Sequence, residues 1–194
     1  PAERIEEVMG RIASESSRMA TLVEDLLTLA RLDEGRPLEI TDIDLVKLAD
    51  NAVFDLQALD PTRTVGLTGI NSRTPPMTLI VPADRDRISQ VFTNLIGNIV
   101  RYTPEGSPVE IALGRSGDTA IVELRDHGPG IDETDRGRDF ERFYRADTSR
   151  NRKSGGSGLG LAIVSGILAA HKGIASLTKT NGGGLTVRIE LPTE

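Results

Sequence analysis

The chain has no cysteine, no tryptophan and only two histidines, His127 and His171, among its 194 residues. Without cysteine there is no disulfide framework or thiolate metal site, and two histidines leave little for a zinc site. The apolar runs are a few residues long, whereas a membrane helix needs about 20, so we expect neither a membrane span nor a signal peptide. The net charge of −6 argues against a nucleic-acid ligand, which would call for a basic face. A cytosolic location fits these absences.

The composition that remains, 38% hydrophobic and 27% charged, is that of a globular protein. Residues 3–33 predict one long helix, ended by Gly35 and Pro37. A first row of apolar residues recurs at heptad spacing, at Ile5, Ile12, Met19 and Leu26. A second row is interrupted by Glu15 and comprises Val8, Leu22 and Leu29. This pattern favours a helix of a dimer bundle, because about 30 residues is long for a globular helix. The alternative is a helix packed on its own domain.

The rest of the chain mixes short strands and helices without a strict βαβ repeat. Alternation and apolar runs predict strands at 38–42, 64–70, 77–81, 109–115, 119–126, 174–178 and 186–191. Helical periodicity predicts helices at 45–59, 84–102 and 158–170, with Asp84 as a cap. Residues 132–157 are polar and glycine-rich, as in a functional loop. We therefore expect an α/β fold, a two-layer sandwich in which about three helices cover a mixed sheet of about five strands, preceded by one long helix.

The helix at 84–102 carries two asparagines one turn apart. Asn94, Asn98, Arg101 and Tyr102 are spaced i, i+4, i+7 and i+8, which places them on one stripe. Asn is a poor residue inside a helix, where it costs roughly 0.6 kcal/mol relative to Ala. An ordinary solvated helix face is one explanation. A pair of amides followed by a cation and an aromatic ring is better explained by a ligand with a metal, phosphates and a ring.

Two glycine-rich segments follow this helix. In the first, a strand runs into Asp126 and then a turn with Gly128 and Gly130, where the carboxylate can accept a hydrogen bond from an exocyclic amine such as that of adenine. Alone, this turn is unremarkable. In the second, GGSGLGLAIV, glycines open a helix whose N-terminal amides suit phosphates. It is neither a P-loop nor a dinucleotide fingerprint, because Leu161 stands where the first needs lysine and the second glycine.

The three motifs in this order closely resemble the ATP-binding domain of sensor histidine kinases, whose wider clan includes the gyrase, Hsp90 and MutL ATPases. The segment FERFYRAD at 140–147 resembles the phenylalanine box of that family, and GGGLTVRIELP at 182–192 resembles its last glycine box. The resemblance, in detail to actinobacterial members, covers residues 37–194, with a nucleotide lid at about 132–157. Residues 1–36 resemble the second helix of the family's dimerisation and phosphoacceptor hairpin with its linker.

The resemblance implies roles for individual residues. Asn98 would ligate Mg²⁺, with Asn94 near the terminal phosphate. Arg101 would meet phosphate at a position that is usually Lys, Tyr102 would pack on adenine, and Asp126 would read the base. Catalytic roles fall on Asn94, Arg101 and Lys153. The implied nucleotide-binding set is Asn94, Asn98, Arg101, Tyr102, Asp126, Gly128, Gly130, Ile131, Phe143, Arg145, Gly156, Gly158, Leu159, Gly160, Leu161 and Thr186.

The implied activity is transfer of the γ-phosphate of Mg·ATP to a histidine on the dimerisation domain, for relay to an aspartate of a response regulator. Neither histidine here has the family's acceptor context, H-E/D-x-R/K-x-P, so we expect the acceptor on another part of a longer, homodimeric, membrane-anchored protein, with this part at the cytoplasmic face. Three alternatives are an ATPase that uses nucleotide as a conformational clamp, an anti-sigma-type serine kinase and a non-catalytic nucleotide-gated module. The ATPases typically carry a water-activating Glu where Asn94 stands.

Overall fold

The computed structural model describes residues 2–71, 74–131, 140 and 158–194. The described residues form four helices, α1 (Ala2–Asp33), α2 (Leu45–Leu59), α3 (Arg85–Tyr102) and α4 (Gly160–Ala170). The same part of the chain forms seven strands, β1 (Ile40–Asp44), β2 (Val65–Gly69), β3 (Ile80–Asp84), β4 (Val109–Ser116), β5 (Thr119–Asp126), β6 (Ile174–Lys179) and β7 (Leu185–Pro192). No described helix is both long and apolar enough to cross a membrane.

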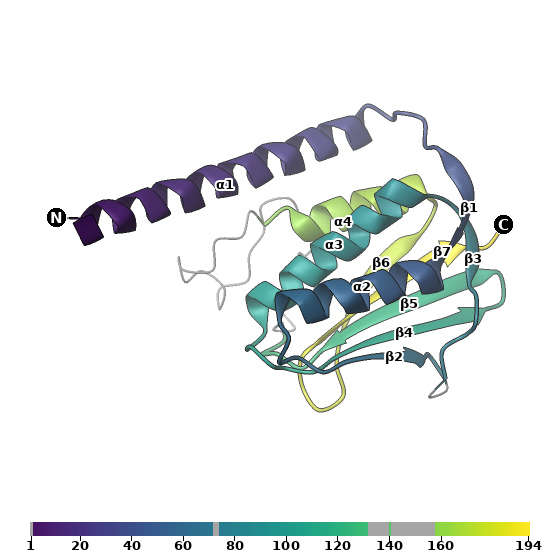
Figure 1. The fold of residues 1–194 in the computed structure, drawn as a ribbon. Helices are drawn as coiled ribbons and strands as arrows, with labels where there is room; N and C mark the ends of the chain where they lie inside the picture. Colours follow the sequence, from purple (N-terminus) through teal and green to yellow (C-terminus); the bar gives the residue numbers. More distant parts are fainter. Residues whose placement is uncertain (1, 72–73, 132–139, 141–157) are drawn as a thin grey trace.

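A five-stranded mixed sheet in the order β2-β4-β5-β7-β6 forms one layer, and α2, α3 and α4 form the other (Figure 1). The β2–β4 pair is parallel and the remaining pairs are antiparallel. Alternate residues of the strands point into the core between the layers, among them Ile111, Val122 and Val187. This arrangement confirms the two-layer sandwich expected from the sequence.

Strands β1 and β3 form a separate antiparallel pair. Strand β1 leads directly into α2, and β3 leads directly into α3. Each strand ends on an aspartate that caps the following helix: Asp44 accepts a hydrogen bond from the amide of Val46 at 3.1 Å, and Asp84 accepts one from the amide of Arg87 at 3.2 Å. A side-chain cap of this kind stabilises a helix by about 1 kcal/mol. Helix α3 carries the asparagine pair, so the cap at Asp84 stabilises the helix on which that pair lies.

Both of these strands lie two to three residues later than the sequence predicts, at Ile40–Asp44 rather than 38–42 and at Ile80–Asp84 rather than 77–81. The predictions followed apolar runs, which end before each strand does. The pairing continues through polar residues and through Pro82, up to the capping aspartates. The other predicted elements begin and end within two residues of the observed ones.

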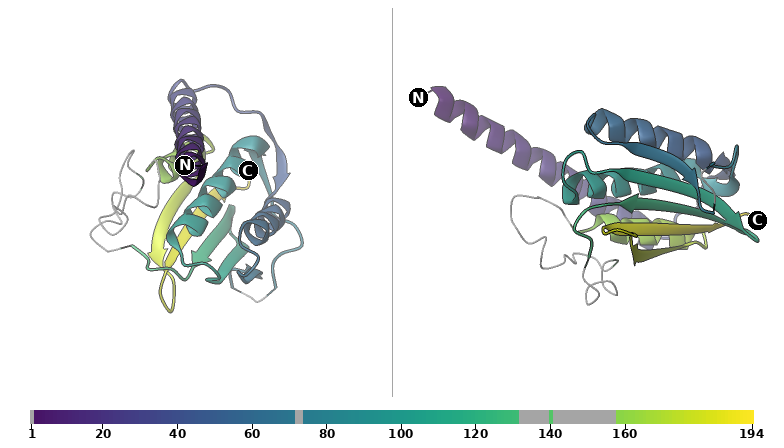
Figure 2. Two further views of the ribbon diagram at one scale, coloured as in Figure 1. Left: turned by 60° about the vertical axis from the view of Figure 1, so that its left-hand side comes forward. Right: turned by 90° about the horizontal axis from the view of Figure 1, so that it is seen from below.

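Helix α1 packs on the domain only through its last turns. Leu29 is buried in the core, and Gln90 of α3 donates a hydrogen bond to Thr28 at 3.2 Å. The rest of α1 projects away from the other elements (Figure 2). There the first heptad row stays exposed, at Ile5, Ile12, Met19 and Leu26. The free part of the helix therefore presents an uncovered apolar seam.

Candidate nucleotide site

The asparagine pair of α3 faces the N-terminus of α4. A Cβ placed on Gly160, the first residue of α4, would lie 3.6 Å from both amide atoms of Asn98 and 3.8 Å from Oδ1 of Asn94. Because Gly160 has no side chain, the amides of Asn94 and Asn98 face the first turn of α4 directly. The structure brings together two motifs that are about 60 residues apart in the chain.

The first turn of α4 has features that suit an anion. No described side chain caps it, and Leu159, the residue before it, has its side chain fully buried in the core. The first backbone N–H groups of an α-helix have no partner within the helix and carry the positive end of its dipole. Gly158 reaches this turn with a φ of 71°, a left-handed conformation that favours glycine. Leu161 follows within the first turn and is half-buried.

Asn94 carries a buried side-chain donor at this junction. Its Nδ2 atom is buried, and none of the residues that the structure describes accepts a hydrogen bond from it. A buried donor without a partner costs about 1–3 kcal/mol, so such an atom marks a place where a partner belongs. A phosphate oxygen is a suitable acceptor beside a helix N-terminus. The described residues therefore fit a phosphate group and its metal at this point.

Asp126 lies at the end of β5 and is 8% exposed, with its side chain on the helix-covered face. Its Oδ1 accepts hydrogen bonds from the amide of Gly128 at 2.9 Å and from the amide of Leu185 at 3.1 Å. Within the described part of the chain, no group donates to Oδ2. One oxygen thus fixes the carboxylate, and the other remains for an amine of a ligand.

The turn after Asp126 depends on glycines at three places. A Cβ on Gly128 would lie 2.8 Å from Cγ2 of Thr103, and one on Gly130, where φ is 72°, would lie 3.0 Å from the carbonyl oxygen of Gly184. A Cβ on Gly184 would collide with the backbone of Asp126 and His127. The last glycine box therefore packs directly on the turn. The sequence predicted a glycine turn here, but not that two glycine boxes would contact each other.

The other predicted residues divide into three groups. Arg101 is exposed and Tyr102 half-buried at the C-terminal end of α3, and Ile131 is half-buried after the glycine turn. Phe143, Arg145, Lys153 and Gly156 lie outside the described residues.

Thr186 does not join the site. It is paired with Arg125 rather than Asp126 in the sheet, so its side chain points to the opposite face, where its hydroxyl lies 2.9 Å from that of Thr180.

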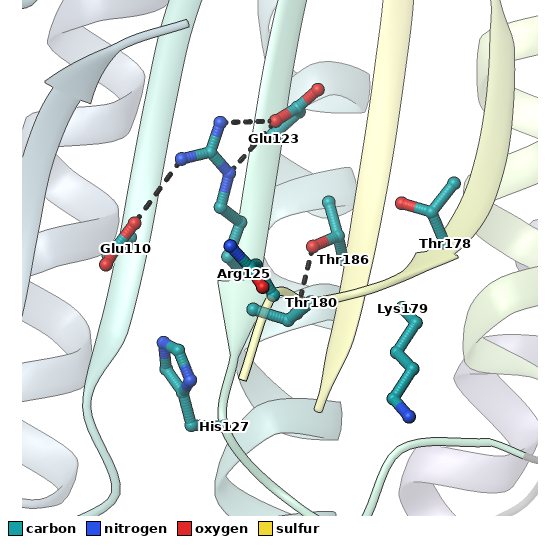
Figure 3. A pocket seen from close by; sticks show the side chains of 9 residues that line it. Glu110, Glu123, Arg125, His127, Thr178, Lys179, Thr180 and Thr186 are labelled. Atoms are coloured by element: carbon teal, nitrogen blue, oxygen red, sulfur yellow. Dashed lines mark hydrogen bonds and ion pairs between the residues drawn. The ribbon is translucent and has the colours of Figure 1, made fainter. Parts of the chain in front are cut away.

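That opposite face, which α2, α3 and α4 leave uncovered, contains a hollow of about 490 Å³ lined by charged and polar residues (Figure 3). Arg125 pairs with Glu123 at 2.6 Å and with Glu110 at 3.3 Å. Burial raises the pKa of Glu123, but hydrogen bonds from Arg125 and Arg188 outweigh burial and lower it. The charges in the hollow are thus largely neutralised by one another. Alternation along β7 therefore places Thr186 on this open face and corrects its expected place at the nucleotide.

Neither histidine is placed as a phosphoacceptor. His171 is buried, its Nδ1 donates to the carbonyl of Ile167 at 2.7 Å, and its Nε2 accepts from the amide of Asp84 at 3.0 Å. It ties the end of α4 to the start of α3. His127 follows Asp126 and lines the hollow on the open face.

The amides of α3, the N-terminus of α4 and the Asp126 carboxylate at the end of β5 thus lie at one end of a two-layer α/β fold. A family model described as "Histidine kinase-, DNA gyrase B-, and HSP90-like ATPase" matches residues 83–194. The chain belongs to this family.

Several known proteins are similar to the chain. The probable sensor histidine kinase TcrY of Mycobacterium tuberculosis is 41% identical over 180 residues, which are 93% of this chain and 37% of TcrY. The structure of full-length ShkA in complex with AMPPNP has a TM-score of 0.75 and 28% identity, and the match covers 92% of this chain and 36% of ShkA. The ATP-binding domain of PrrB from Mycobacterium tuberculosis has a TM-score of 0.64 and 26% identity over 80% of this chain and 98% of that domain. The chain thus spans well under half the length of TcrY.

Proposed function

We propose that this chain is the catalytic part of a sensor histidine kinase. It would bind Mg·ATP and present the γ-phosphate to a histidine on a dimerisation domain, for relay to an aspartate of a response regulator. The observation that carries the proposal is the convergence of the Asn94–Asn98 pair, the N-terminus of α4 and the Asp126 turn on one end of the helix layer. The similarity to TcrY, a named sensor histidine kinase, supports it.

The roles follow from the chemistry of each group. The amide oxygen of Asn98 would ligate Mg²⁺, which takes few protein ligands alongside water and phosphate oxygens. Bound Mg²⁺ neutralises charge on the phosphates. Arg101 would contact phosphate with its planar fork of donors, and the N-terminal amides of α4 would bind phosphate oxygens. Oδ2 of Asp126 would accept a hydrogen bond from the exocyclic amine of adenine, with Tyr102 packing on the base.

Asn94 favours transfer over hydrolysis. A general base must accept a proton from the attacking water, and an amide cannot do so at neutral pH. The site therefore holds nucleotide without a residue at this position that would activate water. That is the reason to prefer a kinase over an ATPase that uses nucleotide as a clamp.

The remaining parts of the proposal concern the longer protein. Residues 1–36 would be the second helix of a dimerisation hairpin with its linker, and residues 37–194 the catalytic domain with a lid at about 132–157. The exposed seam of α1 supports a homodimer. We also propose that the full-length protein is a membrane-anchored sensor with this part at the cytoplasmic face.

The decisive experiment mixes the chain with radiolabelled ATP and the histidine-containing hairpin of the same full-length protein. We expect label on the hairpin that is lost in acid and stable in base, as for phosphohistidine. The same hairpin with its acceptor histidine changed to glutamine is the control and should stay unlabelled. Acid-stable label would favour the serine kinase instead. Phosphate release without labelling would favour the ATPase, and failure to bind Mg·ATP would refute every catalytic assignment.

A further inference from the structure

A buried ion pair lies in the loop between α2 and β2, next to the segment that follows α3. Arg63 and Asp60 are only 4% and 6% exposed, and Nε of Arg63 lies 3.1 Å from Oδ2 of Asp60. Asp60 also accepts hydrogen bonds from the hydroxyl of Thr62 at 2.6 Å and from the amide of Gly106 at 2.9 Å. Burying two charges is expensive unless further hydrogen bonds satisfy them, and here they do.

The remaining donors of Arg63 hold the segment that follows α3. Its Nη1 donates to the hydroxyl of Thr103 at 2.8 Å and to the carbonyl of Ser107 at 2.9 Å, and its Nη2 donates to the carbonyl of Pro104 at 3.2 Å. These acceptors lie directly after Arg101 and Tyr102. A planar guanidinium can reach several acceptors in fixed directions at once, which a lysine ammonium on one flexible stem cannot.

Thr103 connects this cluster to the turn of the nucleotide site. Its hydroxyl donates to the carbonyl of Ile99 at 2.7 Å and accepts from Arg63, so two hydrogen bonds fix its rotamer. The rotamer directs the methyl group Cγ2 against Gly128, where a Cβ would come within 2.8 Å. The amide of Gly128 in turn donates to Asp126. A continuous set of contacts thus runs from Asp60 and Arg63 to the carboxylate proposed to read the base.

We propose that Arg63 is a positioning residue for the adenine site and that it acts through Thr103. Arg63 fixes the hydroxyl of Thr103, whose methyl group then sets the position of Gly128 and hence the direction of the Asp126 carboxylate. The inference rests on the proposed function, because it assumes that the site binds an adenine nucleotide. Arg63 touches no part of that site itself.

The test measures the affinity of the 194-residue chain for Mg·AMPPNP by calorimetry, well below the melting temperature of each variant. Arg63→Lys replaces the planar guanidinium, whose donors have fixed directions, by a single ammonium group. Thr103→Val removes the hydroxyl while keeping the shape of the side chain. Each should weaken binding about tenfold, the effect of roughly one buried hydrogen bond. Because Arg63 acts through Thr103, the double variant should bind within about twofold of the weaker single variant, whereas independent effects would multiply.

Two controls separate positioning from loss of stability. Asp44→Asn alters another buried aspartate, one that accepts hydrogen bonds from the amides of Val46 and Leu79 at the far end of α2. It should lower the melting temperature and leave the affinity within about twofold of wild type, since Asp44 has no contact with the site. The amide resonance of Gly128 in ¹⁵N-labelled, nucleotide-free protein should move in Thr103→Val and Arg63→Lys but not in Asp44→Asn.

The outcomes are distinguishable from failure of the proposed function. If the wild-type chain does not bind Mg·AMPPNP, both proposals fall. If wild type binds, Asp126→Asn weakens binding and Thr103→Val does not, only the positioning role is wrong. Multiplicative effects in the double variant, or equal losses of affinity in Asp44→Asn, would also overturn it. Should Arg63→Lys fail to fold, Thr103→Val and the Gly128 resonance decide the question.

Discussion

At the scale of single residues, the two oxygens of Asp126 have separate tasks. Oδ1 is held by the amides of Gly128 and Leu185, and Oδ2 has no donor among the residues described. An Asn at this position can keep an oxygen toward the two amides, but it then turns an NH₂ group toward the ligand. The substitution therefore alters recognition of the base more than it alters the fold.

We predict that Asp126→Asn weakens ATP binding about tenfold to a hundredfold, because a hydrogen bond to a charged group contributes about 1.5–3 kcal/mol. Calorimetry with Mg·ATP measures the change. Asp118→Asn is the matched control, since Asp118 is an exposed carboxylate in the β4–β5 turn, and it should bind as wild type does. Unchanged affinity in Asp126→Asn would remove this carboxylate from the adenine site.

Asn98 has a different task from Asn94, one turn away on the same stripe. We predict that Asn98→Ala abolishes most Mg²⁺-dependent labelling of the supplied hairpin, because the amide oxygen that would ligate the metal is gone. Asn98→Asp should also disrupt transfer, since it adds a negative charge beside the phosphates. Thr93→Ala, an exposed change on the same helix, is the control. Normal labelling by Asn98→Ala would show that the metal is held elsewhere.

At the scale of elements, the loop between α2 and β2 carries a dependence on pH. Hydrogen bonds from the hydroxyl of Thr62 and the amide of Gly106 lower the pKa of Asp60 from 3.8 to about 2. The pKa of the folded state thus lies below that of the unfolded chain. The ionised carboxylate stabilises the fold above about pH 4, and that contribution is lost as the pH falls from about 4 to about 2.

We therefore predict that Asp60→Asn is less stable than wild type at neutral pH and that this difference shrinks between about pH 4 and about pH 2. Urea unfolding at a series of pH values gives the free energy of unfolding of each protein. Asp118→Asn, at an exposed site, should follow wild type throughout. A constant gap between Asp60→Asn and wild type across this range would contradict the role given to the Asp60 carboxylate.

Elements were largely predictable from the sequence, because periodicity reports the face that each segment buries. The bounds of α2 and β5 were predicted to the residue. Thr186 was misplaced because a motif match says nothing about which face of a strand a side chain occupies. The Arg63 cluster left only a local signal, the Asp60-Pro61-Thr62 turn, since the partners of a buried arginine come from distant segments.

At the scale of the whole molecule, α1 leaves the domain with its apolar seam uncovered. Exposed apolar stripes of this kind mark protein interfaces. We predict that the chain self-associates through α1 and that Ile12→Glu, which puts a charge into the seam, makes it monomeric. Ser14→Glu adds the same charge on the opposite side of the helix and should not. Sedimentation equilibrium reports the state, and dimers that persist in Ile12→Glu would show that the seam is not the interface.

The contact between Gly184 and the backbone of Asp126 and His127 has a consequence for synthesis of the chain. The carboxylate of Asp126 is oriented by the amide of Leu185, the first residue of β7, and β7 is made after α3 and β5. A nascent chain that has already formed α3 and β5 therefore still lacks Gly184 and the amide of Leu185, which hold the turn and the carboxylate of Asp126. We therefore expect nucleotide to bind only after β7 has paired with β5, when both amides hold the Asp126 carboxylate.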